Sequence, residues 1–524
     1  MSIAETFVDT RSAADATAAD ATRARLAASG LTLLMSLAAL AAFAASLREW
    51  TPAAALALPL VLASAAWISG GAATALLGLF QGAPGDRAGP IPAPPRGRTA
   101  ILVTLCNEDA GPLAAYLRSL LPALDRAGLG AAACVFVLSD SFRPDSIAAE
   151  EAALADLVAD GRVVYRRRAR NTGHKPGNIA DWLETRGAEY GYMLVLDADS
   201  RMSAGRIARM IRTMERRPDL GLLQAGIALV PGRSRFGRHQ RLSARLLTPN
   251  FIRGFAALTG PSGNYWGHNA LIRTAAFRCA ARLPALPGAA PLGGPILSHD
   301  FVEAAWIRRA GWAVALDPDL RGSAEDGPQT VEAFHRRDRR WAQGNLQHLR
   351  LLAEPGLDPV SRLHLASGAF SYLAAPVWLA LIVMIASGAV AVDGALPLAV
   401  VALLLLVPKL CALPRFLARA RTPRRRARVL RASLGELAVS TRLAPLVMLR
   451  QSRSVAEVLS GRDCGWKSAR PEARLPRGFA EVVAGATLAA LALWTGPGAA
   501  LWLMPLVLPL LGAPLLLRWL EAQP

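Results

Sequence analysis

Long apolar blocks near both ends of the chain enclose a central region with a different pattern. Each block approaches the roughly 20 apolar residues that a helix needs to cross a bilayer. None of them has the polar face of a helix at the surface of a soluble protein. We therefore predict about six membrane-spanning helices, whose apolar blocks are residues 26–47, 53–77, 367–389, 396–413, 479–494 and 499–517.

The central region, residues 99–352, alternates short apolar runs with amphipathic segments. This alternation predicts a mainly parallel, Rossmann-like sheet with helices on both faces, inserted between the membrane helices. Ligands of such sheets bind beyond the carboxyl ends of the strands. The expected strands are residues 100–106, 133–140, 162–168 and 191–199, and the expected helices are 111–124, 145–161 and 178–187.

The remaining segments complete the predicted organisation. Residues 1–25, rich in Ala, Asp and Thr, are expected to form a disordered tail, and the Pro- and Gly-rich residues 81–98 a linker. The full plan is a tail at 1–25, two spans at 26–80, the linker at 81–98, the α/β domain at 99–352, an interfacial helix and two spans at 353–413, a basic cytosolic or interfacial segment at 414–478, and two spans with a short tail at 479–524.

Within the basic segment, residues 432–459 allow two interpretations. They contain Glu436, Arg442, Pro445 and Arg450, and both of their flanks are basic. A single crossing would place those flanks on opposite sides of the membrane, against the charge rule for membrane proteins. We favour an amphipathic helix or hairpin at the interface. Two short extra spans, giving eight in all, are the alternative.

Charge changes the picture further. The chain has 524 residues, is 53% hydrophobic and carries a formal net charge of +20. Basic residues cluster at 414–431 and 450–478, whereas the connectors 48–52 and 391–395 carry almost no net positive charge. This positive-inside pattern places the α/β domain in the cytoplasm, predicts contact with membrane lipid and argues against nucleic acid as a partner. The five cysteines have no metal or disulfide spacing, as expected in a reducing compartment.

Two acids, Asp197 and Asp199, follow the apolar run 193–196. Side chains two apart in an extended backbone point the same way, so these like charges repel unless something positive lies between them. Mg²⁺ and Mn²⁺ prefer carboxylate and phosphate oxygens. The pair therefore predicts a divalent metal that bridges a nucleotide-sugar diphosphate, with a solvated strand end as the alternative.

Two more motifs suit a nucleotide. Asp140 ends an expected strand, where its carboxylate could accept hydrogen bonds from a uracil ring or ribose, or could cap a helix. Lys175 lies in a Gly-containing turn that opens a helix, and helix N-termini bind phosphate. Asn178 and Asp181 follow it and could hold the nucleotide. A solvated basic loop is the alternative interpretation.

The remaining candidates lie toward the end of the α/β domain. Asp300 is expected between an apolar strand and a helix, where it could act as a general base or as a helix N-cap, whereas His299 is interpreted as structural. In residues 335–345, Trp341 could stack on a sugar ring. The nearby Arg337 and Arg340 could bind a diphosphate bidentately. Ordinary juxtamembrane basic residues are the alternative.

In this order the motifs resemble those of the processive membrane-bound family 2 glycosyltransferases, whose relatives include bacterial cellulose and hyaluronan synthases. The family pattern is a GT-A fold with a uridine-binding Asp, a DxD motif, a catalytic Asp in a TED-like motif and a (Q/R)xxRW motif. Here Ser-His stands in place of Thr-Glu before the catalytic Asp. The matching residues are Asp140, Asp197 with Asp199, Asp300, and Arg337-x-x-Arg340-Trp341.

The last motif begins with Arg337 where cellulose synthases have Gln, and together with the Ser-His change this points to a subfamily. The chain is similar to the inner-membrane glucosyltransferases that make the backbone of osmoregulated periplasmic glucans in Gram-negative bacteria. The resemblance covers residues 99–413 well and the C-terminal spans only in layout. It is carried by TLCNED (104–109), VLSDS (137–141), YWGHNALIR (265–273), ILSHDFVEAA (296–305) and RDRRWAQGNLQHLRLL (337–352).

The resemblance implies UDP-glucose as donor, a β-linked glucan as acceptor and product, and inversion at the anomeric carbon. Asp300 would be the catalytic base, and a divalent metal (Mg²⁺ or Mn²⁺) on Asp197 and Asp199 would stabilise the departing UDP. Donor-binding residues would be Asp140, Lys175, Asn178, Asp197, Arg337 and Arg340. Acceptor-binding residues would be Trp341, Tyr265, Trp266 and His268.

The same resemblance implies a multi-pass protein of the bacterial inner membrane. The spans would conduct the growing glucan outward, with Arg442 as a candidate along that path and residues 461–471 as a gating loop. A periplasmic glucan-processing protein and acyl carrier protein are suggested as partners. The alternatives are a synthase of another, cellulose-like polysaccharide, transfer of a single sugar to a lipid carrier, or a transporter with a cytosolic regulatory domain.

Overall fold

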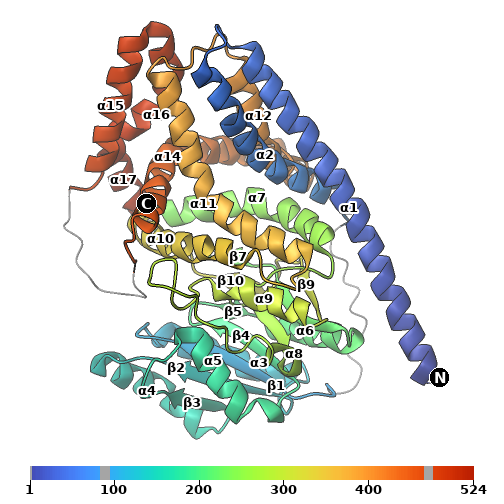
Figure 1. Cartoon of the computed structure of the whole chain (residues 1–524). Coiled ribbons are helices and arrows are strands. Elements are labelled where there is room, and N and C mark those ends of the chain that lie inside the picture. Colours follow the sequence, from blue (N-terminus) through green and yellow to red (C-terminus); the bar gives the residue numbers. More distant parts are fainter. Residues whose placement is uncertain (1–2, 83–94, 465–475, 524) are drawn as a thin grey trace.

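The computed structural model of the chain describes residues 3–82, 95–464 and 476–523. An α/β domain forms one end of the molecule and long apolar helices form the other (Figure 1). Three helices lie between these two parts: α7 (Arg235–Thr259), α10 (Val331–Gln347) and α14 (Pro423–Leu459). The α/β domain is thus inserted between membrane helices, as predicted.

The α/β domain is built on a seven-stranded sheet in the order β3-β2-β1-β4-β8-β6-β9. All neighbouring strands are parallel except β8, which runs antiparallel to both β4 and β6. The sheet is therefore mainly parallel. The strands are β1 (Thr99–Leu105), β2 (Ala133–Ser139), β3 (Val163–Arg167), β4 (Tyr192–Asp197), β6 (Leu220–Ala225), β8 (Ala270–Arg273) and β9 (Ala313–Asp317).

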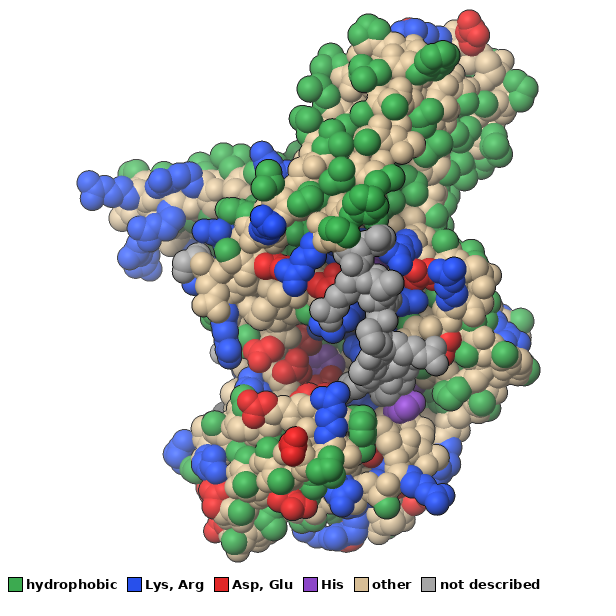
Figure 2. Space-filling view, turned by 90° about the vertical axis from the view of Figure 1, so that its left-hand side faces the viewer, with side chains coloured by type: hydrophobic (Ala, Val, Ile, Leu, Met, Phe, Trp, Pro, Cys, Tyr) green, Lys and Arg blue, Asp and Glu red, His purple; other side chains and the backbone are tan. Residues whose placement is uncertain are grey.

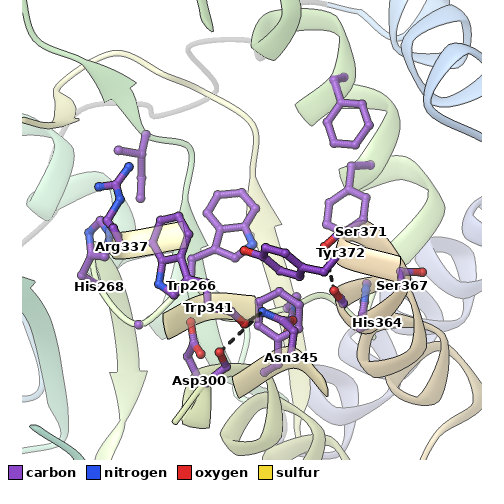
Figure 3. A pocket seen from close by; sticks show the side chains of 18 of the residues that line it. Trp266, His268, Asp300, Arg337, Trp341, Asn345, His364, Ser367, Ser371 and Tyr372 are labelled. Atoms are coloured by element: carbon purple, nitrogen blue, oxygen red, sulfur yellow. Dashed lines mark hydrogen bonds between the residues drawn. The ribbon is translucent and has the colours of Figure 1, made fainter. Parts of the chain in front are cut away.

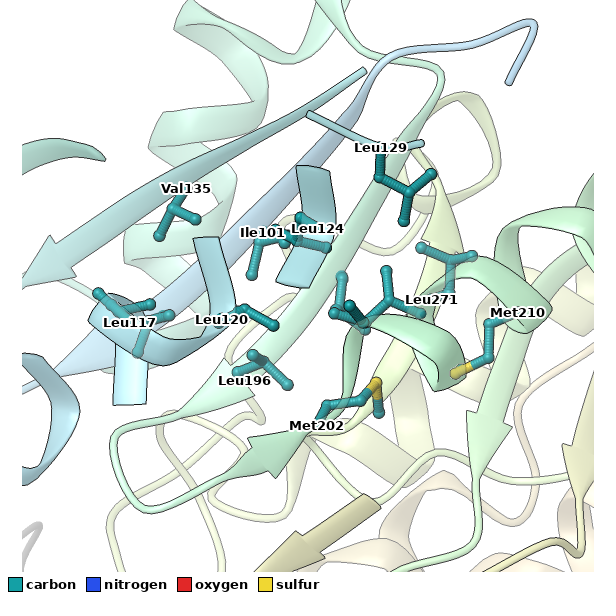
Figure 4. Close-up of a cluster of buried hydrophobic side chains, with 14 of the residues drawn as sticks. Ile101, Leu117, Leu120, Leu124, Leu129, Val135, Leu196, Met202, Met210 and Leu271 are labelled. Carbon is teal, nitrogen blue, oxygen red and sulfur yellow. The ribbon is translucent and has the colours of Figure 1, made fainter. Parts of the chain in front are cut away.

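Helices cover both faces of this sheet because each has one apolar stripe. In α3 (Gly111–Arg126), Leu113, Leu117 and Leu124 recur at helical spacing and are fully buried. Figure 4 shows this cluster, which α4 (Pro144–Ala159) and α6 (Ala204–Arg216) complete on the same face. Each buried leucine stabilises the fold by about 1.5–3 kcal/mol.

The opposite face is covered by α5 (His174–Thr185) and α9 (His299–Arg309), whose Trp182 and Ile307 are buried. The segment before α9 differs from the prediction. Residues 296–298 form no strand, because the Leu297 amide donates to the Gln347 side chain, 2.9 Å away, instead of joining a sheet. Asp300 therefore begins a helix that follows a loop.

A second, three-stranded sheet lies beside the carboxyl ends of the main sheet. It joins β5 (Arg201–Met202), β10 (Ser323–Glu325) and β7 (Ala228–Leu229) in the order β5-β10-β7. β5 follows the two acids of β4, so this small sheet brings β10, more than 120 residues later in the chain, next to them.

The apolar end of the molecule contains α1 (Ile3–Ala45), α2 (Pro52–Phe80), α11 (Pro359–Ala386), α12 (Leu396–Leu410), α15 (Phe479–Thr495), α16 (Pro497–Leu511) and α17 (Ala513–Glu521). Within the described residues, five helices are long and apolar enough to cross a membrane. A sixth is added if α16 and α17, bent by 55°, form one span. Five of the six predicted spans coincide with α1, α2, α11, α12 and the bent pair of α16 and α17. The sixth coincides with α15, which has only 17 residues, and the remaining long helix is α14.

Three predicted boundaries need correction. α1 begins at Ile3, so most of the expected tail belongs to a helix. α11 runs unbroken from Pro359 into the membrane part. The separate interfacial helix that was expected before the third span is therefore the first turns of α11. α14 is one continuous helix, which removes the hairpin and the two extra spans. It lies across the ends of the upright helices (Figure 1), as expected for a helix at the interface.

Two glycines let α2 and α7 cross at close range. A Cβ at Gly254 would lie 1.9 Å from the Thr74 carbonyl oxygen, and a Cβ at Gly78 1.7 Å from that of Asn250. We expect Gly254→Ala to separate these helices and to destabilise the protein by about 1–3 kcal/mol. The measurement is thermal unfolding of the purified protein. Gly30→Ala, in α1 with nothing within 4 Å of the new Cβ, is the control and should not lower the melting temperature; equal melting of both variants would contradict the close crossing.

Candidate active site

A cavity of about 1710 Å³ opens at the carboxyl ends of β1, β2 and β4 and continues between α1, α2, α11 and α12. β1 lies between β2 and β4, so the polar residues that end these strands share one edge of the sheet. Eleven of the twelve predicted site residues line this cavity: Asp140, Lys175, Asn178, Asp197, Asp199, Trp266, His268, Asp300, Arg337, Arg340 and Trp341.

Tyr265 is the exception, and its predicted acceptor role is wrong. Its ring is buried in the core beneath the sheet. Its hydroxyl donates to the Gly267 carbonyl at 2.7 Å. In the loop before β8, Tyr265 points inward, whereas Trp266 and His268 face the cavity. Arg442 is also absent from the cavity lining: it is exposed on α14 and donates to the Ala438 carbonyl at 2.8 Å.

Lys175 places a positive group beside the acid pair. Its ammonium group bonds Asp197 Oδ1, and the Thr104 hydroxyl donates to the same oxygen at 3.3 Å. Burial alone would raise the pKa of Asp197, but the charges of Lys175 and His268 outweigh it and lower that pKa to about 2. Asp197 is therefore ionised at neutral pH.

The turn that carries Lys175 depends on glycine. Gly173 adopts a left-handed conformation (φ +69°) just before α5. A Cβ at Gly177 would lie 2.1 Å from the Thr172 carbonyl oxygen. Asn178, one residue later, is buried and receives a hydrogen bond from Arg166 at its side-chain oxygen. This turn thus holds Lys175 over the end of β4.

Asp199 is in a different electrostatic position. The described residues give its carboxylate no ion pair, and burial together with the charges of Asp197 and Glu325 raises its pKa to about 6. No group of three or more His, Cys, Asp or Glu side chains in the described ranges is arranged to hold a metal. Two carboxylates with hard oxygen donors fit a divalent cation whose other ligands are substrate phosphates and water.

The Asp140 carboxylate forms an ion pair with an arginine. Its two oxygens accept from Arg168 Nε at 2.7 Å and Nη2 at 2.8 Å, and Arg168 also bonds Asp181 at 2.8 Å. The Asp140 carboxylate therefore reaches the cavity as part of a bidentate pair rather than as a free acceptor. Asp181, which also pairs with Arg282 at 3.2 Å, is part of this structural network.

Asp300 lies in the first turn of α9 against the backbone of Gly267. A Cβ at Gly267, whose φ is +85°, would be 3.4 Å from Asp300 Oδ2. Burial is the main cause that raises the pKa of Asp300 above its ordinary value, and Glu303 adds to it against the opposing charge of His299. The carboxylate is thus a stronger base than an exposed one. His299 Nδ1 lies 3.1 Å from Glu303 Oε1, consistent with its predicted structural role.

α10 contributes Arg337, Arg340 and Trp341 to the lining of the site. The guanidinium of Arg337 lies 4.5 Å above the Trp341 ring, which is 45% exposed and faces the cavity. A Cβ at Gly344 would lie 2.5 Å from the Ser298 amide nitrogen, so this glycine lets α10 contact the loop that leads to Asp300. Figure 3 shows Trp266, Trp341 and Asp300 around the same opening.

Comparisons with known proteins identify the family of the chain. Residues 100–280 match glycosyl transferase family 2, and residues 192–413 match glycosyl transferase family group 2. Glucans biosynthesis glucosyltransferase H of Xylella fastidiosa is 40% identical over 84% of this chain and 76% of its own length. The proteins of that name from Cereibacter sphaeroides and Bradyrhizobium diazoefficiens are both 39% identical over 87% of this chain, and over 83% and 67% of their own lengths.

The chain belongs to the glucans biosynthesis glucosyltransferase H family. It is a glycosyltransferase, and its α/β domain has the GT-A fold. The apolar helices on both sides of that domain make it a multi-pass membrane protein. The resemblance found in the sequence motifs is confirmed.

Sequence reasoning missed several residues that build the site of this glucosyltransferase. Glu325 of β10 lies 3.2 Å from His268 Nε2. Burial lowers the pKa of His268, but the charges of Asp197 and Glu325 outweigh this effect and raise that pKa to about 9. His268 is therefore protonated at neutral pH, and its positive charge lies close to the acid pair. Buried Gln224 holds the same loop, accepting from the Trp266 amide at 2.9 Å and donating to the His268 carbonyl at 3.0 Å.

Signals for these residues are weak or absent. Asn345 could have been identified from the sequence, because it belongs to the segment that carries the RxxRW motif. Its side-chain amide donates to the Trp341 carbonyl at 2.9 Å. Glu325 lies in a short stretch without a pattern. Residues 465–471 of the predicted gating loop, and most of the predicted linker, lie outside the described residues. At the start of the loop, Asp463 Oδ1 accepts from Gln343 of α10 at 2.7 Å.

Proposed function

We propose that this glycosyltransferase is an inverting, processive enzyme that uses UDP-glucose to build the β-glucan backbone of osmoregulated periplasmic glucans and moves the product across the membrane. One observation carries the proposal. A single cavity extends from the acid pair and Asp300, past Trp341, to the space between α1, α2, α11 and α12. Such a cavity offers a donor site, an acceptor site and a route into the membrane without a break.

On the donor side, Asp197 and Asp199 would hold Mg²⁺ or Mn²⁺. The ion would neutralise negative charge on the diphosphate leaving group. Lys175, Arg337 and Arg340 line the same cavity and bring further positive charge to a diphosphate. The ion pair of Asp140 and Arg168 would form the wall of the cavity next to the nucleoside of the donor.

Asp300 would take the proton from the acceptor hydroxyl. The hydroxyl oxygen would then bond to the anomeric carbon as the bond from that carbon to the diphosphate oxygen breaks. The proton remains on Asp300, and the electron pair of the broken bond leaves with UDP. A single displacement of this kind inverts the anomeric carbon. The raised pKa of Asp300 suits the role of base.

On the acceptor side, Trp341 would stack on the terminal glucose, and Trp266 lies near it in the same cavity (Figure 3). Beyond it, the lining of the cavity is mainly apolar but includes hydroxyl and aromatic side chains, which suit the hydroxyl rim and the C–H faces of glucose. These residues come from three membrane helices: Ser29, Thr32 and Ser36 of α1, Trp67 and Thr74 of α2, and Ser367, Ser371 and Tyr372 of α11. The basic flanks of the spans favour the bacterial inner membrane with the GT-A domain in the cytoplasm.

The test is synthesis from labelled UDP-glucose by the purified chain in sealed vesicles, with the GT-A domain outside and Mg²⁺ or Mn²⁺ present. We expect UDP release and a β-linked glucan of many residues inside the vesicles, resistant to a glucanase added outside. Linkage analysis of that polymer identifies the glucan. A lipid-linked product with one sugar, or a polymer that the added glucanase removes, would overturn processivity or translocation respectively.

A further inference from the structure

Eight arginines gather where the chain leaves α12. They lie on α13 (Leu413–Arg419), the connector that follows and the first turns of α14. We call residues 415–431 the arginine arm. Its arginines are Arg415, Arg419, Arg421, Arg424, Arg425, Arg426, Arg428 and Arg431. Figure 2 shows Lys and Arg side chains on an arm that projects beside the apolar helices.

The charge of the arginine arm is not balanced inside the protein. Residues 394–435 contain no Asp or Glu, and within the described chain none of the eight arginines has an acidic partner. Residues 421–428 are all exposed. Arg426 makes a structural contact, donating to the Ala420 carbonyl at 3.2 Å. A helix that exposes so much charge of one sign fits an anionic surface outside the molecule.

The position of the arm favours lipid over a soluble anion. It directly follows α12, so it lies at the level where that apolar helix ends. On α14, Leu430 and Leu434 are 44% and 65% exposed and share one face of the helix, next to the face formed by Arg424 and Arg428. Apolar and cationic faces side by side are typical of a helix in the headgroup region.

The far end of α14 holds the helix that carries Trp341. Gln451 donates to Asp338 of α10 at 3.1 Å, and Arg339 of α10 lies 2.9 Å from Glu457. Val455 and Val458 complete this contact by packing in one cluster with Ala342 and Leu346 of α10. One continuous helix thus connects the arginine arm to a wall of the active site.

We propose that the arginine arm binds the headgroups of anionic phospholipids and that this contact, carried along α14, sets the position of α10 and so the rate of glycosyl transfer. The inference needs the glycosyltransferase activity but not the identity or export of the glucan. Binding of lipid is measured separately from turnover, so its failure is distinguishable from failure of the proposed function.

The test uses the full chain in vesicles of phosphatidylcholine with or without phosphatidylglycerol. Two quantities are measured: affinity for a fluorescent phosphatidylglycerol and the rate of UDP release. The variant R424Q/R425Q/R428Q spares Arg426 because of its structural contact. Each arginine near a membrane contributes about a fivefold factor, so affinity should fall about one hundredfold. The increase in turnover caused by phosphatidylglycerol should disappear with it.

Two further variants control for folding and for total charge. R424K/R425K/R428K keeps the charge and should retain binding and stimulation. R126Q/R216Q/R278Q removes three exposed arginines of the GT-A domain and should behave as the unaltered chain. Unchanged lipid affinity in the R424Q/R425Q/R428Q variant, or preference of the arm for inorganic polyphosphate over phosphatidylglycerol, would overturn the lipid assignment. Lipid binding without any change in turnover would overturn the link to α10.

Discussion

Asp300→Asn is expected to reduce turnover by about a thousandfold, the size of effect that general-base catalysis provides. The substitution preserves the shape of the side chain in the first turn of α9 but removes its ability to take a proton. Affinity for UDP-glucose should change little, because Asp300 would contact the acceptor rather than the donor. The measurements are the rate of UDP release and the equilibrium binding of UDP-glucose.

The pH dependence gives a second readout of the same group. Burial raises the pKa of Asp300, and only the ionised form can accept a proton. Turnover of the unaltered chain should therefore fall as the pH is lowered through this raised pKa and level off above it. The Asp300→Asn variant should lack this step. Asp145→Asn, which removes an acid from the first turn of α4 outside the cavity, is the matched control and should keep full activity. Comparable turnover in the Asp300→Asn variant would reject the base assignment.

Asp199→Ala should weaken UDP binding in the presence of Mg²⁺ or Mn²⁺ by at least about tenfold, as expected when a metal site loses a ligand. Without metal, the variant and the unaltered chain should bind UDP alike. The pKa of Asp199, raised to about 6, marks a carboxylate that lacks a positive partner among the described residues, and a cation would supply it. The measurement is calorimetric titration with UDP at fixed metal concentrations.

The control for this variant is Asp219→Ala. Asp219 is an acid of the same domain that pairs with Arg217 at 2.7 Å and does not line the cavity. Its removal should leave the metal-dependent gain in UDP affinity intact. If Asp199→Ala also keeps that gain, then Asp199 is no metal ligand, and the role passes to other oxygen donors of the cavity.

The order of strands and helices between residues 99 and 199 was predictable because each of these elements carries its own pattern. The apolar runs that became β1, β2 and β4, and the stripe of Leu113 and Leu117 on α3, are local features of the sequence. Asp140, Asp197 and Asp199 could be assigned to one edge because parallel strands end at the same side of a sheet. Their like charge also predicted a positive group between them; Lys175 pairs with Asp197, whereas Asp199 has no ion pair among the described residues.

Partners that depend on contacts distant in sequence were not predictable. Glu325 meets His268 because β10 pairs with β5, and nothing in the short stretch around Glu325 indicates that pairing. Tyr265 and Trp266 are adjacent residues in a loop without a regular period, so the sequence could not decide which faces the core. The sequence also left open whether residues 432–459 form one amphipathic helix or a hairpin, and the structure shows one continuous helix, α14.

The sequence by itself determined most of the membrane helices, the mainly parallel domain between them and the identity of the acids that line the cavity, since hydrophobic period and motif order are properties of the chain. Tertiary structure alone decided that Arg168 pairs with the Asp140 carboxylate and that Glu325 and Gln224 contact the loop of Trp266. It also decided that α14 connects the arginine arm to α10. Those relations arise from packing between segments far apart in the chain, where close contacts at Gly254 and Gly344 fix which side chains can meet.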